Sequence, residues 1–523
     1  MRRFHWHRLR HWIQPSYGLL IAILLLGIFL RTFQFPNNPP GLFVDEAGAG
    51  YETFSLLRTG ADRWGVTWPV YFISWGSGQS VLYSYLSIPI VAALGLDRLS
   101  VRLLSLFVGI LTLPLLYVTV KRTAGTSAAL IATLLLAIMP WHVMISRWAL
   151  DANLLPFFML LGTYTVERAL TSQSPKWVWI ALLPWGLALY AYAMAYVVVP
   201  ILLLLVLAFY RRAILANWKA WLGALALYVL LAMPIALFLV KNWIVQDVLP
   251  VEPWLPFGIP LVPISRLAQV SSPLPERLLL NLFFIVSGFQ DGEVRNSVLG
   301  IAPAFIVTFP LAIVGAARFI KDRRADLFLL WLAACLPLFF IADPAINRIN
   351  AIFVPMLVVA VYGFAELRRR LYVSRRILTT AVGALVMLQA LVFVADYFLV
   401  YPTVPDVELA FFKGLDRAVS RGLAVAGPSE PILVTDRIVL PEILTAFYSN
   451  YAPSDYQREL RYTVEYGAII VKSFGRFYFG LDNLPNPSAP FTYILGKWDD
   501  DPCAKPQASL ETRLWQVGRC RAE

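Results

Sequence analysis

Apolar segments long enough to cross a bilayer alternate with short polar ones over the first 400 residues. A membrane-spanning helix needs about twenty mainly apolar residues. The pattern therefore predicts a polytopic α-helical membrane protein with about 11 transmembrane helices. The segments lie at about 16–33, 102–120, 126–143, 153–170, 177–192, 194–210, 221–240, 299–317, 325–342, 348–366 and 377–400.

From about residue 401 onward the pattern becomes that of a soluble domain. VELAFFKGLDRAVS and PEILTAFYSNY have helical periodicity, whereas PILVTD and FTYILGKW have the composition of short strands. We therefore expect a basic N-terminus (1–15), a transmembrane domain (16–400) and a small α/β domain (401–523). The transmembrane domain would include two long outer loops, 34–101 and 241–298.

The distribution of basic residues predicts the orientation. Cytoplasmic loops carry an excess of Lys and Arg, and every second loop is basic if the N-terminus is cytoplasmic. The first apolar segment has no small-residue cleavage site, which favours a retained helix over a signal peptide. We therefore expect a multi-pass plasma-membrane protein whose C-terminal domain is extracytoplasmic. The inner loops would hold Lys121 and Arg122; Arg168 and Lys176; Arg211, Arg212 and Lys219; Lys321, Arg323 and Arg324; and Arg368, Arg369, Arg370, Arg375 and Arg376.

Composition agrees with a membrane protein and argues against a nucleic-acid-binding protein and against a histidine-rich metal site. Hydrophobic residues make up 59% of the chain and charged residues 15%, a balance typical of membrane proteins. The net charge of +12 does not indicate nucleic-acid binding, because the basic residues form short runs between apolar segments. All histidines except His142 lie in the first eleven residues, so no histidine-rich metal site is expected.

The cysteines divide into two groups. Cys335 lies in an apolar segment and fits a packing role. Cys503 and Cys520 lie close together in the C-terminal domain. A disulfide is plausible if that domain is extracytoplasmic, and two free thiols are equally compatible with the sequence.

An acidic pair, Asp45 and Glu46, lies a short distance after the first apolar segment. Carboxylates at a membrane surface are costly unless they are paired, solvated or used for chemistry. The pair opens the segment VDEAGAGYETFSLLRTG, which we predict to be an amphipathic helix lying against the bilayer. Asp45 could also be the N-cap of that helix, since Asp is a favoured capping residue. Capping and chemistry are compatible.

Other polar residues fall at the predicted outer ends of the spans. Arginine matches phosphate oxygens well through its planar fork, so an anionic head group is an attractive ligand here. Arg102 could instead pair with Asp97 or extend to the interface, and Arg147 could pair with Asp151 one helical turn away. The further candidates are Arg295, Asn347 and Arg348.

Three segments in order carry a resemblance to a known family. VDEAGAGYETFSLLRTG, SVRLLSLFVGILTLPLLYVTVKR and PWHVMISRWALDANLLPFF resemble the protein O-mannosyltransferases (glycosyltransferase family 39) and their bacterial relatives, which include the aminoarabinose transferases of lipid A. The resemblance covers about residues 15 to 400. One departure is that SGQSVLYSYLSIP stands where typical members carry a His-Pro-Pro element. This departure weakens the case for a protein acceptor.

The resemblance implies a GT-C fold and a membrane glycosyltransferase. Such an enzyme transfers a monosaccharide from a polyprenyl-phosphate carrier to an acceptor hydroxyl on the extracytoplasmic face. The family's acidic residue maps to Asp45, the expected general base, with Glu46 as its supporting partner. A single displacement would invert the anomeric configuration.

The implied donor also suggests roles for the other candidates. A leaving polyprenyl phosphate needs cationic stabilisation, for which Arg102, Arg147 and Arg348 are candidates, and Arg295 is a weaker one. Asp151 would orient the acceptor or pair with Arg147. No cofactor is expected, and a divalent metal is possible but not favoured.

Three other functions share parts of this pattern. A lipid-linked sugar flippase or transporter would place ionisable groups deep within its spans, whereas here they lie mostly at the ends of the spans. A ligase or polymerase that uses polyprenyl-pyrophosphate-linked oligosaccharides would have the same topology. An inactive envelope scaffold would not need Asp45. The sequence does not reveal the sugar or the acceptor.

Overall fold

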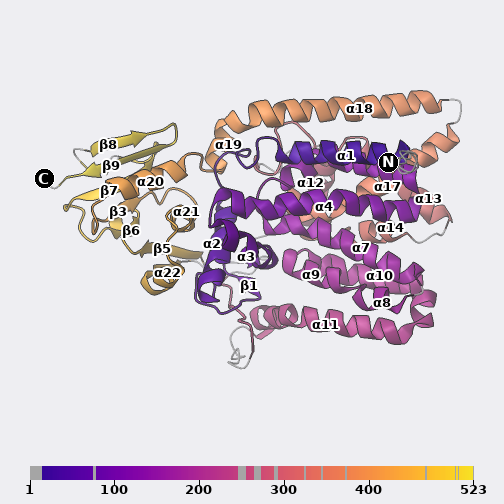
Figure 1. Ribbon diagram of the computed structural model, residues 1–523, viewed down its shortest axis with the longest axis horizontal. Helices are drawn as coiled ribbons and strands as arrows, with labels where there is room; N and C mark the ends of the chain where they lie inside the picture. The colour runs from indigo at the N-terminus through magenta and orange to yellow at the C-terminus, as the bar shows by residue number, and fades with distance from the viewer. Residues whose placement is uncertain are drawn as a thin grey trace, which may run out of the picture.

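A helical bundle and a C-terminal sheet region make up the molecule, which we describe from a computed structural model (Figure 1). The bundle helices run roughly parallel to one another, and the sheet lies beyond one end of them. The basic N-terminus, Arg323 and Arg324 lie outside the described residues. Those are 15–74, 78–172, 174–245, 255–263, 273–287, 293–322, 326–342, 345–371, 374–465, 468–500, 502–503 and 506–521.

The bundle is built from helices of very different lengths. They are α1 (Pro15–Thr32), α4 (Arg98–Ala124), α5 (Thr126–Ile138), α7 (Leu155–Thr171), α8 (Pro175–Ile180), α9 (Leu183–Ala191), α10 (Ala195–Ala216), α11 (Trp218–Val240), α13 (Thr308–Asp322), α14 (Leu327–Ala334), α15 (Leu338–Ile341), α17 (Phe353–Arg370) and α18 (Arg375–Ala395). The connecting segments contain α2 (Val44–Thr59), β1 (Tyr71–Phe72), β2 (Gln79–Ser80), α3 (Leu82–Leu94), α6 (Pro140–Ile145), η2 (Asp151–Leu154), η3 (Lys241–Val245), α12 (Leu274–Ser287), α16 (Ile346–Ile349) and η5 (Asn350–Ile352).

Five helices in the described part of the chain are long and apolar enough to cross a membrane. They are Arg98–Ala124, Ala195–Ala216, Trp218–Ile244, Ile346–Arg370 and Arg375–Thr403. Shorter apolar helices accompany them at Ser16–Thr32, Leu82–Leu94, Thr126–Ile138, Thr308–Arg318 and Leu327–Ile341. These helices agree with a multi-pass membrane protein, but the predicted count of about 11 spans is not confirmed.

Proline accounts for part of the difference between the predicted spans and the observed helices. The predicted span 177–192 is divided into α8 and α9, and Pro184 lies in the first turn of α9. The predicted span 325–342 is divided into α14 and α15, with Pro337 directly before α15. Proline lacks an N–H and disfavours a helical conformation in the residue before it. In the other direction, α3 is an apolar helix inside the segment predicted to be an outer loop.

Helix α2 confirms the predicted helix at VDEAGAGYETFSLLRTG, but its surroundings correct the prediction. It packs against α3 and α4 on one side and against α21 and α22 of the sheet region on the other. Gly50 allows this double approach, since a Cβ there would lie 2.6 Å from Val101 and 2.7 Å from Phe447. The helix therefore does not lie against the bilayer. Its small residues let both neighbours enclose it.

The C-terminal region is a seven-stranded mixed sheet with helices. The strand order is β4-β5-β6-β3-β7-β9-β8, in which β3 is parallel to β6 and β7 and the other neighbours are antiparallel. Cys503 and Cys520 form a disulfide, and Cys335 is buried and free. The start of the domain at residue 401 stays a prediction.

The elements of the C-terminal region and of the segment leading into it are η6 (Asp396–Val400), η7 (Tyr401–Thr403), α19 (Pro405–Ala410), α20 (Leu415–Val425), β3 (Ile432–Val434), α21 (Pro441–Tyr448), α22 (Pro453–Glu459), β4 (Arg461–Glu465), β5 (Ala468–Phe474), β6 (Phe477–Phe479), η8 (Leu481–Asn483), β7 (Phe491–Gly496), β8 (Pro506–Glu511) and β9 (Trp515–Cys520).

Two basic helix ends lie side by side within the bundle. The last turn of α4 contains Lys121, whose ammonium lies 5.6 Å from the centre of the Tyr17 ring near the start of α1. The last turn of α17 contains three arginines, and Tyr362 of this helix is hydrogen-bonded to Thr123 of α4 at 3.3 Å. Such a gathering is what the positive-inside rule requires. The side of the membrane on which this end lies stays a prediction.

Candidate active site

The acidic pair divides into one buried and one partly exposed carboxylate. Phe43 is the N-cap of α2, so Asp45 lies in the first turn and is not the capping residue that the sequence allowed. Glu46 contributes to the cap instead, since its Oε2 accepts a hydrogen bond from the Phe43 N–H at 2.9 Å. Glu46 is fully buried, whereas Asp45 is partly exposed. Of the two, only Asp45 is open to a substrate.

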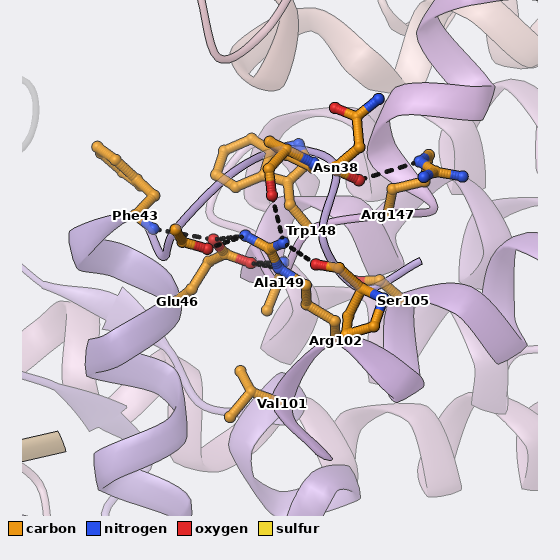
Figure 2. Close-up of polar contacts among 12 residues, drawn as sticks. Asn38, Phe43, Glu46, Val101, Arg102, Ser105, Arg147, Trp148 and Ala149 are labelled. Carbon is orange, nitrogen blue, oxygen red and sulfur yellow. Dashed lines mark hydrogen bonds and ion pairs between the residues drawn. The ribbon is translucent and has the colours of Figure 1, made fainter. Parts of the chain in front are cut away.

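Glu46 and Arg102 form a buried ion pair at the centre of the site (Figure 2). Arg102 donates from Nε to Glu46 Oε1 and from Nη2 to Glu46 Oε2, both at 2.7 Å. The Ala149 N–H donates to Glu46 Oε1 at 2.8 Å. Both side chains are fully buried. A bidentate pair with these additional donors has the geometry that offsets the desolvation of two charges.

The rest of the Arg102 guanidinium holds residues 36–43, which we call the strap. Nη1 donates to the carbonyls of Pro36 and Pro39 at 2.6 and 2.8 Å, and Nη2 donates to the carbonyl of Gly41 at 3.0 Å. Together with Glu46, these acceptors occupy every N–H of the guanidinium. Arg102 has no donor left for a phosphate, and it does not pair with Asp97, which caps α4 instead.

Arg147 is engaged in a similar way. Its Nε donates to the carbonyl of Asn38 at 3.2 Å (Figure 2), and its Nη1 donates to the carbonyls of Leu30 and Arg31 at 3.0 and 2.9 Å. Nη2 donates to the carbonyl of Phe33 at 2.6 Å. The predicted alternative, a pair with a carboxylate one helical turn later, does not form because the chain leaves helical geometry between α6 and η2. Arg147 therefore joins the end of α1 to the strap.

Asp151 connects the outer loop to the bundle. Its Oδ2 accepts from the Ser80 N–H at 2.9 Å and its Oδ1 from the Ala152 N–H at 2.8 Å. Ser80 belongs to β2, and the neighbouring Gln79 donates from Nε2 to the Asp45 carbonyl at 3.4 Å. Asp151 and Asp45 are thus linked through β2.

Buried amide side chains surround this connection. The Asn153 Nδ2 donates to the Trp148 carbonyl at 2.9 Å, and the Asn350 Nδ2 donates to the Ala152 carbonyl at 2.6 Å. On the other side of each amide, the oxygen is buried without a hydrogen-bond partner among the described residues, and the same holds for Gln79 and Asn347. Buried polar atoms are normally satisfied, so these four oxygens stand out as buried acceptors without a described donor.

Sequence reasoning selected Asn347 but missed Gln79, Asn153 and Asn350. Asn153 and Asn350 are amides at the ends of apolar segments, and that was the available signal. Gln79 lies in the stretch that replaces the family's His-Pro-Pro element. The elements that carry these residues meet, because η2 contacts β2, α16 and the neighbouring bundle helices.

Two predicted arginines remain beside the site. The Arg295 guanidinium lies 4.2 Å from the centre of the Phe43 ring, directly before α2, and its Nη2 is 2.5 Å from Glu293 Oε2. Arg348 is partly exposed on α16, which packs against η2. Unlike the fully buried Arg102 and Arg147, both present part of their surface. Within the described ranges, no group of three or more His, Cys, Asp or Glu residues could hold a metal ion.

The chain is similar to known proteins in part of its sequence and in its fold. Residues 80–238 match the family model described as dolichyl-phosphate-mannose-protein mannosyltransferase. ArnT from Cupriavidus metallidurans in its apo state is 12% identical, with a TM-score of 0.56 over 97% of this chain and 98% of that one. The same protein bound to undecaprenyl phosphate is 11% identical, with a TM-score of 0.55 and the same coverage. No curated protein sequence matches.

The shared fold extends over the bundle and the C-terminal region alike, because nearly all of both chains is covered. Together with the match over residues 80–238, it confirms the resemblance seen in the sequence. The chain therefore shares the fold of ArnT, the GT-C glycosyltransferase fold, and its residues 80–238 match the mannosyltransferase family model.

Proposed function

We propose that this protein transfers a monosaccharide from a polyprenyl-phosphate carrier to an acceptor hydroxyl, with Asp45 as the general base. One observation carries the proposal. The two residues of the acidic pair at the start of α2 differ. Glu46 is buried in an ion pair with Arg102, whereas Asp45 remains partly exposed. A base must reach the proton that it removes, and a buried, fully bonded carboxylate cannot do so.

The position of Asp45 suits a carboxylate that must stay ionised. It lies in the first turn of α2, where the partial positive charge of the helix N-terminus favours an anion. The acceptor hydroxyl would give its proton to Asp45 as its oxygen attacks the anomeric carbon. The polyprenyl phosphate leaves with the electron pair of the broken bond, and the configuration inverts.

The cationic part of the site is assigned to Arg295 and Arg348. Both are partly exposed, and a charged donor directed at the leaving phosphate stabilises the charge that develops there. Arg102 and Arg147 would act indirectly, by fixing the strap and the start of α2. The amide oxygens of Gln79, Asn153 and Asn350 would accept hydrogen bonds from sugar or acceptor hydroxyls.

An apolar groove is available for the lipid tail of the donor. It has a volume of about 630 Å³ and runs between α18 and the helices α1, α5, α13 and α17. Its lining is almost entirely aliphatic and aromatic, with Leu30, Phe305 and Val394 among the residues. A polyprenyl chain is already surrounded by hydrocarbon in the bilayer, so this groove would hold it through van der Waals packing.

The test is transfer from a polyprenyl-phosphate sugar by the protein in proteoliposomes, with membranes of the producing cells as the acceptor pool. Asp45→Asn should abolish transfer without changing the thermal unfolding midpoint. The matched control is Asp406→Asn, an exposed carboxylate on α19, which should retain activity. Wild-type transfer by Asp45→Asn would remove the proposed base.

Two further arms define the donor. The corresponding pyrophosphate-linked sugar should be inactive, and exclusive use of that donor would indicate an oligosaccharide ligase instead. Transfer should continue after chelation of divalent cations. Flipping of the lipid-linked sugar without transfer would support a transporter.

A further inference from the structure

A charged cleft lies where the strap meets the C-terminal region. It has a volume of about 590 Å³ and is lined by the strap, the first residue of α4, the connection from α19 to α20 and the turn between β8 and β9. A second hollow of about 370 Å³ shares Asn37, Arg98 and Asp416 with it. Because they share these residues, we call the two hollows together the cleft.

The cleft contains more cations than carboxylates. Glu408 is buried and accepts from both Lys413 Nζ at 2.6 Å and Arg513 Nη1 at 2.9 Å. Asp416 pairs with Arg98 at 3.2 Å. The fourth cation, Arg417, lines the cleft and forms no ion pair with the residues that the structure describes. Four positive charges therefore face two carboxylates that are already engaged.

Unused hydrogen-bond donors accompany this excess charge. The Nε of Arg98 is buried and has no partner among the described residues. Arg513 uses only Nη1 in its contact with Glu408. Arg102, by contrast, donates from every N–H to the protein. Charged donors without protein acceptors, gathered in a concave site, favour an anion with several oxygens.

The cleft also adjoins an apolar edge. Leu99 lines the second hollow and is 38% exposed, and Leu94 at the end of α3 is 53% exposed. Arg98 itself begins α4, a helix of membrane-spanning length. Cations at the end of such a helix lie at the level of lipid head groups, where apolar neighbours can contact acyl chains.

We propose that this cleft binds a phosphate-bearing head group, held by Arg98, Arg417 and Arg513. The ligand class is a phosphate monoester or diester, carried by a membrane lipid or by a soluble molecule. The inference is independent of the proposed transfer reaction, because none of these residues belongs to the site at Asp45. It adds a second anion site at the junction of the two regions.

The test measures phosphate binding by the full-length protein and a matched pair of double variants. Arg417→Gln/Arg513→Gln removes two cleft cations and leaves the Glu408–Lys413 and Arg98–Asp416 pairs intact. Arg421→Gln/Arg461→Gln removes the same charge from exposed positions outside the cleft. Arg421 lies one turn after Arg417 on α20.

Two arms distinguish the sources of the ligand. In nanodiscs, native mass spectrometry counts phosphatidylglycerol retained from a phosphatidylcholine background. In detergent without anionic lipid, calorimetry measures the affinity for glycerol phosphate. Retention in the first arm alone indicates a lipid head group, and binding in the second arm indicates a soluble phosphate. Either result supports the site.

The cleft variant should bind at least about tenfold more weakly than wild type in the arm that shows binding. The control variant should bind like wild type. Equal losses in both variants would show only a bulk charge effect and would overturn the proposal. Absence of binding by the wild-type protein in both arms would also overturn it, and thermal unfolding of each variant verifies that the fold is kept.

Discussion

The strap and the cleft use arginine in opposite ways, although they lie next to each other. Arg102 and Arg147 are fully buried and direct their donors at backbone carbonyls and Glu46. Arg98 and Arg513 each make one described contact with a carboxylate and retain further donors. The first arrangement fixes a loop, and the second can bind a ligand. The number of donors left over separates a structural arginine from a binding one.

The largest effect should come from breaking the buried pair at the strap. Arg102→Met leaves Glu46 as an uncompensated buried charge, which costs about 3 to 5 kcal/mol. The thermal unfolding midpoint in detergent should fall markedly, or no folded protein should be obtained. The Glu46→Leu/Arg102→Met double variant should be less unstable than the two single changes together. Additive losses would mean that the two side chains do not act as a pair.

A second prediction concerns the interface of α2 with the C-terminal region. Buried carboxyl groups outnumber buried cations there, whereas cations outnumber carboxylates in the cleft. Burial raises the pKa of Glu442 to about 7 and that of Glu52 to about 8, and Arg63 is the buried cation beside them. The folded state therefore binds protons more tightly than the unfolded state, whose Glu pKa is near 4.5. This contribution to stability is complete below about pH 4.5 and is lost as pH rises towards 7.

Glu442→Gln should remove the part of that pH dependence that belongs to Glu442, and Glu52 should keep its own part. The difference between the unfolding free energies of wild type and variant should change by up to about 3 kcal/mol across this interval. Unfolding midpoints measured over a pH series provide the test, with Glu465→Gln on the exposed strand β4 as the control. Parallel profiles for wild type and Glu442→Gln would show that Glu442 does not titrate in this range.

A smaller effect is expected from a change that keeps the charge at the strap. Arg147→Lys retains a cation but loses the planar fork that reaches the carbonyls of Leu30, Phe33 and Asn38. Unsatisfied carbonyls should lower the unfolding free energy by about 1 to 2 kcal/mol. Chemical denaturation should detect this loss. If Arg147→Lys were as stable as wild type, charge alone would explain the role of Arg147.

The smallest effect on stability should come from the cleft. Arg417→Gln changes an exposed side chain, and surface substitutions of this kind usually remain within about 0.5 kcal/mol. Its unfolding midpoint should match that of wild type. A large loss would place Arg417 with the structural arginines and remove the distinction between the two regions.

Local sequence patterns predicted several features because short-range physics determines them. The helix at Val44–Thr59 was expected from its own sequence, and the C-terminal strands at Ile432–Val434 and Phe491–Gly496 lie within the predicted segments. The motif order also led to the right fold. The open alternative for Cys503 and Cys520 was decided by the pairing of β9 with its neighbours, which brings the two residues together.

Other expectations failed where the partner of a side chain is distant in sequence. Local pairing of Arg102 with Asp97 was considered, but its carboxylate partner is Glu46, 56 positions away. The Asn350 amide bonds a carbonyl 198 positions away. No local pattern specifies such a carbonyl, because every residue carries one.

The amino-acid sequence by itself determined that this is a membrane protein, where α2 begins and ends, and which acidic pair stands at its start. Those properties follow from apolar length and from neighbours a few positions apart. Only the tertiary structure decided that Glu46 is buried and Asp45 partly exposed, and that Arg102 uses every donor while the cleft arginines do not. The burial of a carboxylate and the number of donors that an arginine has left both depend on which distant segments the fold brings together.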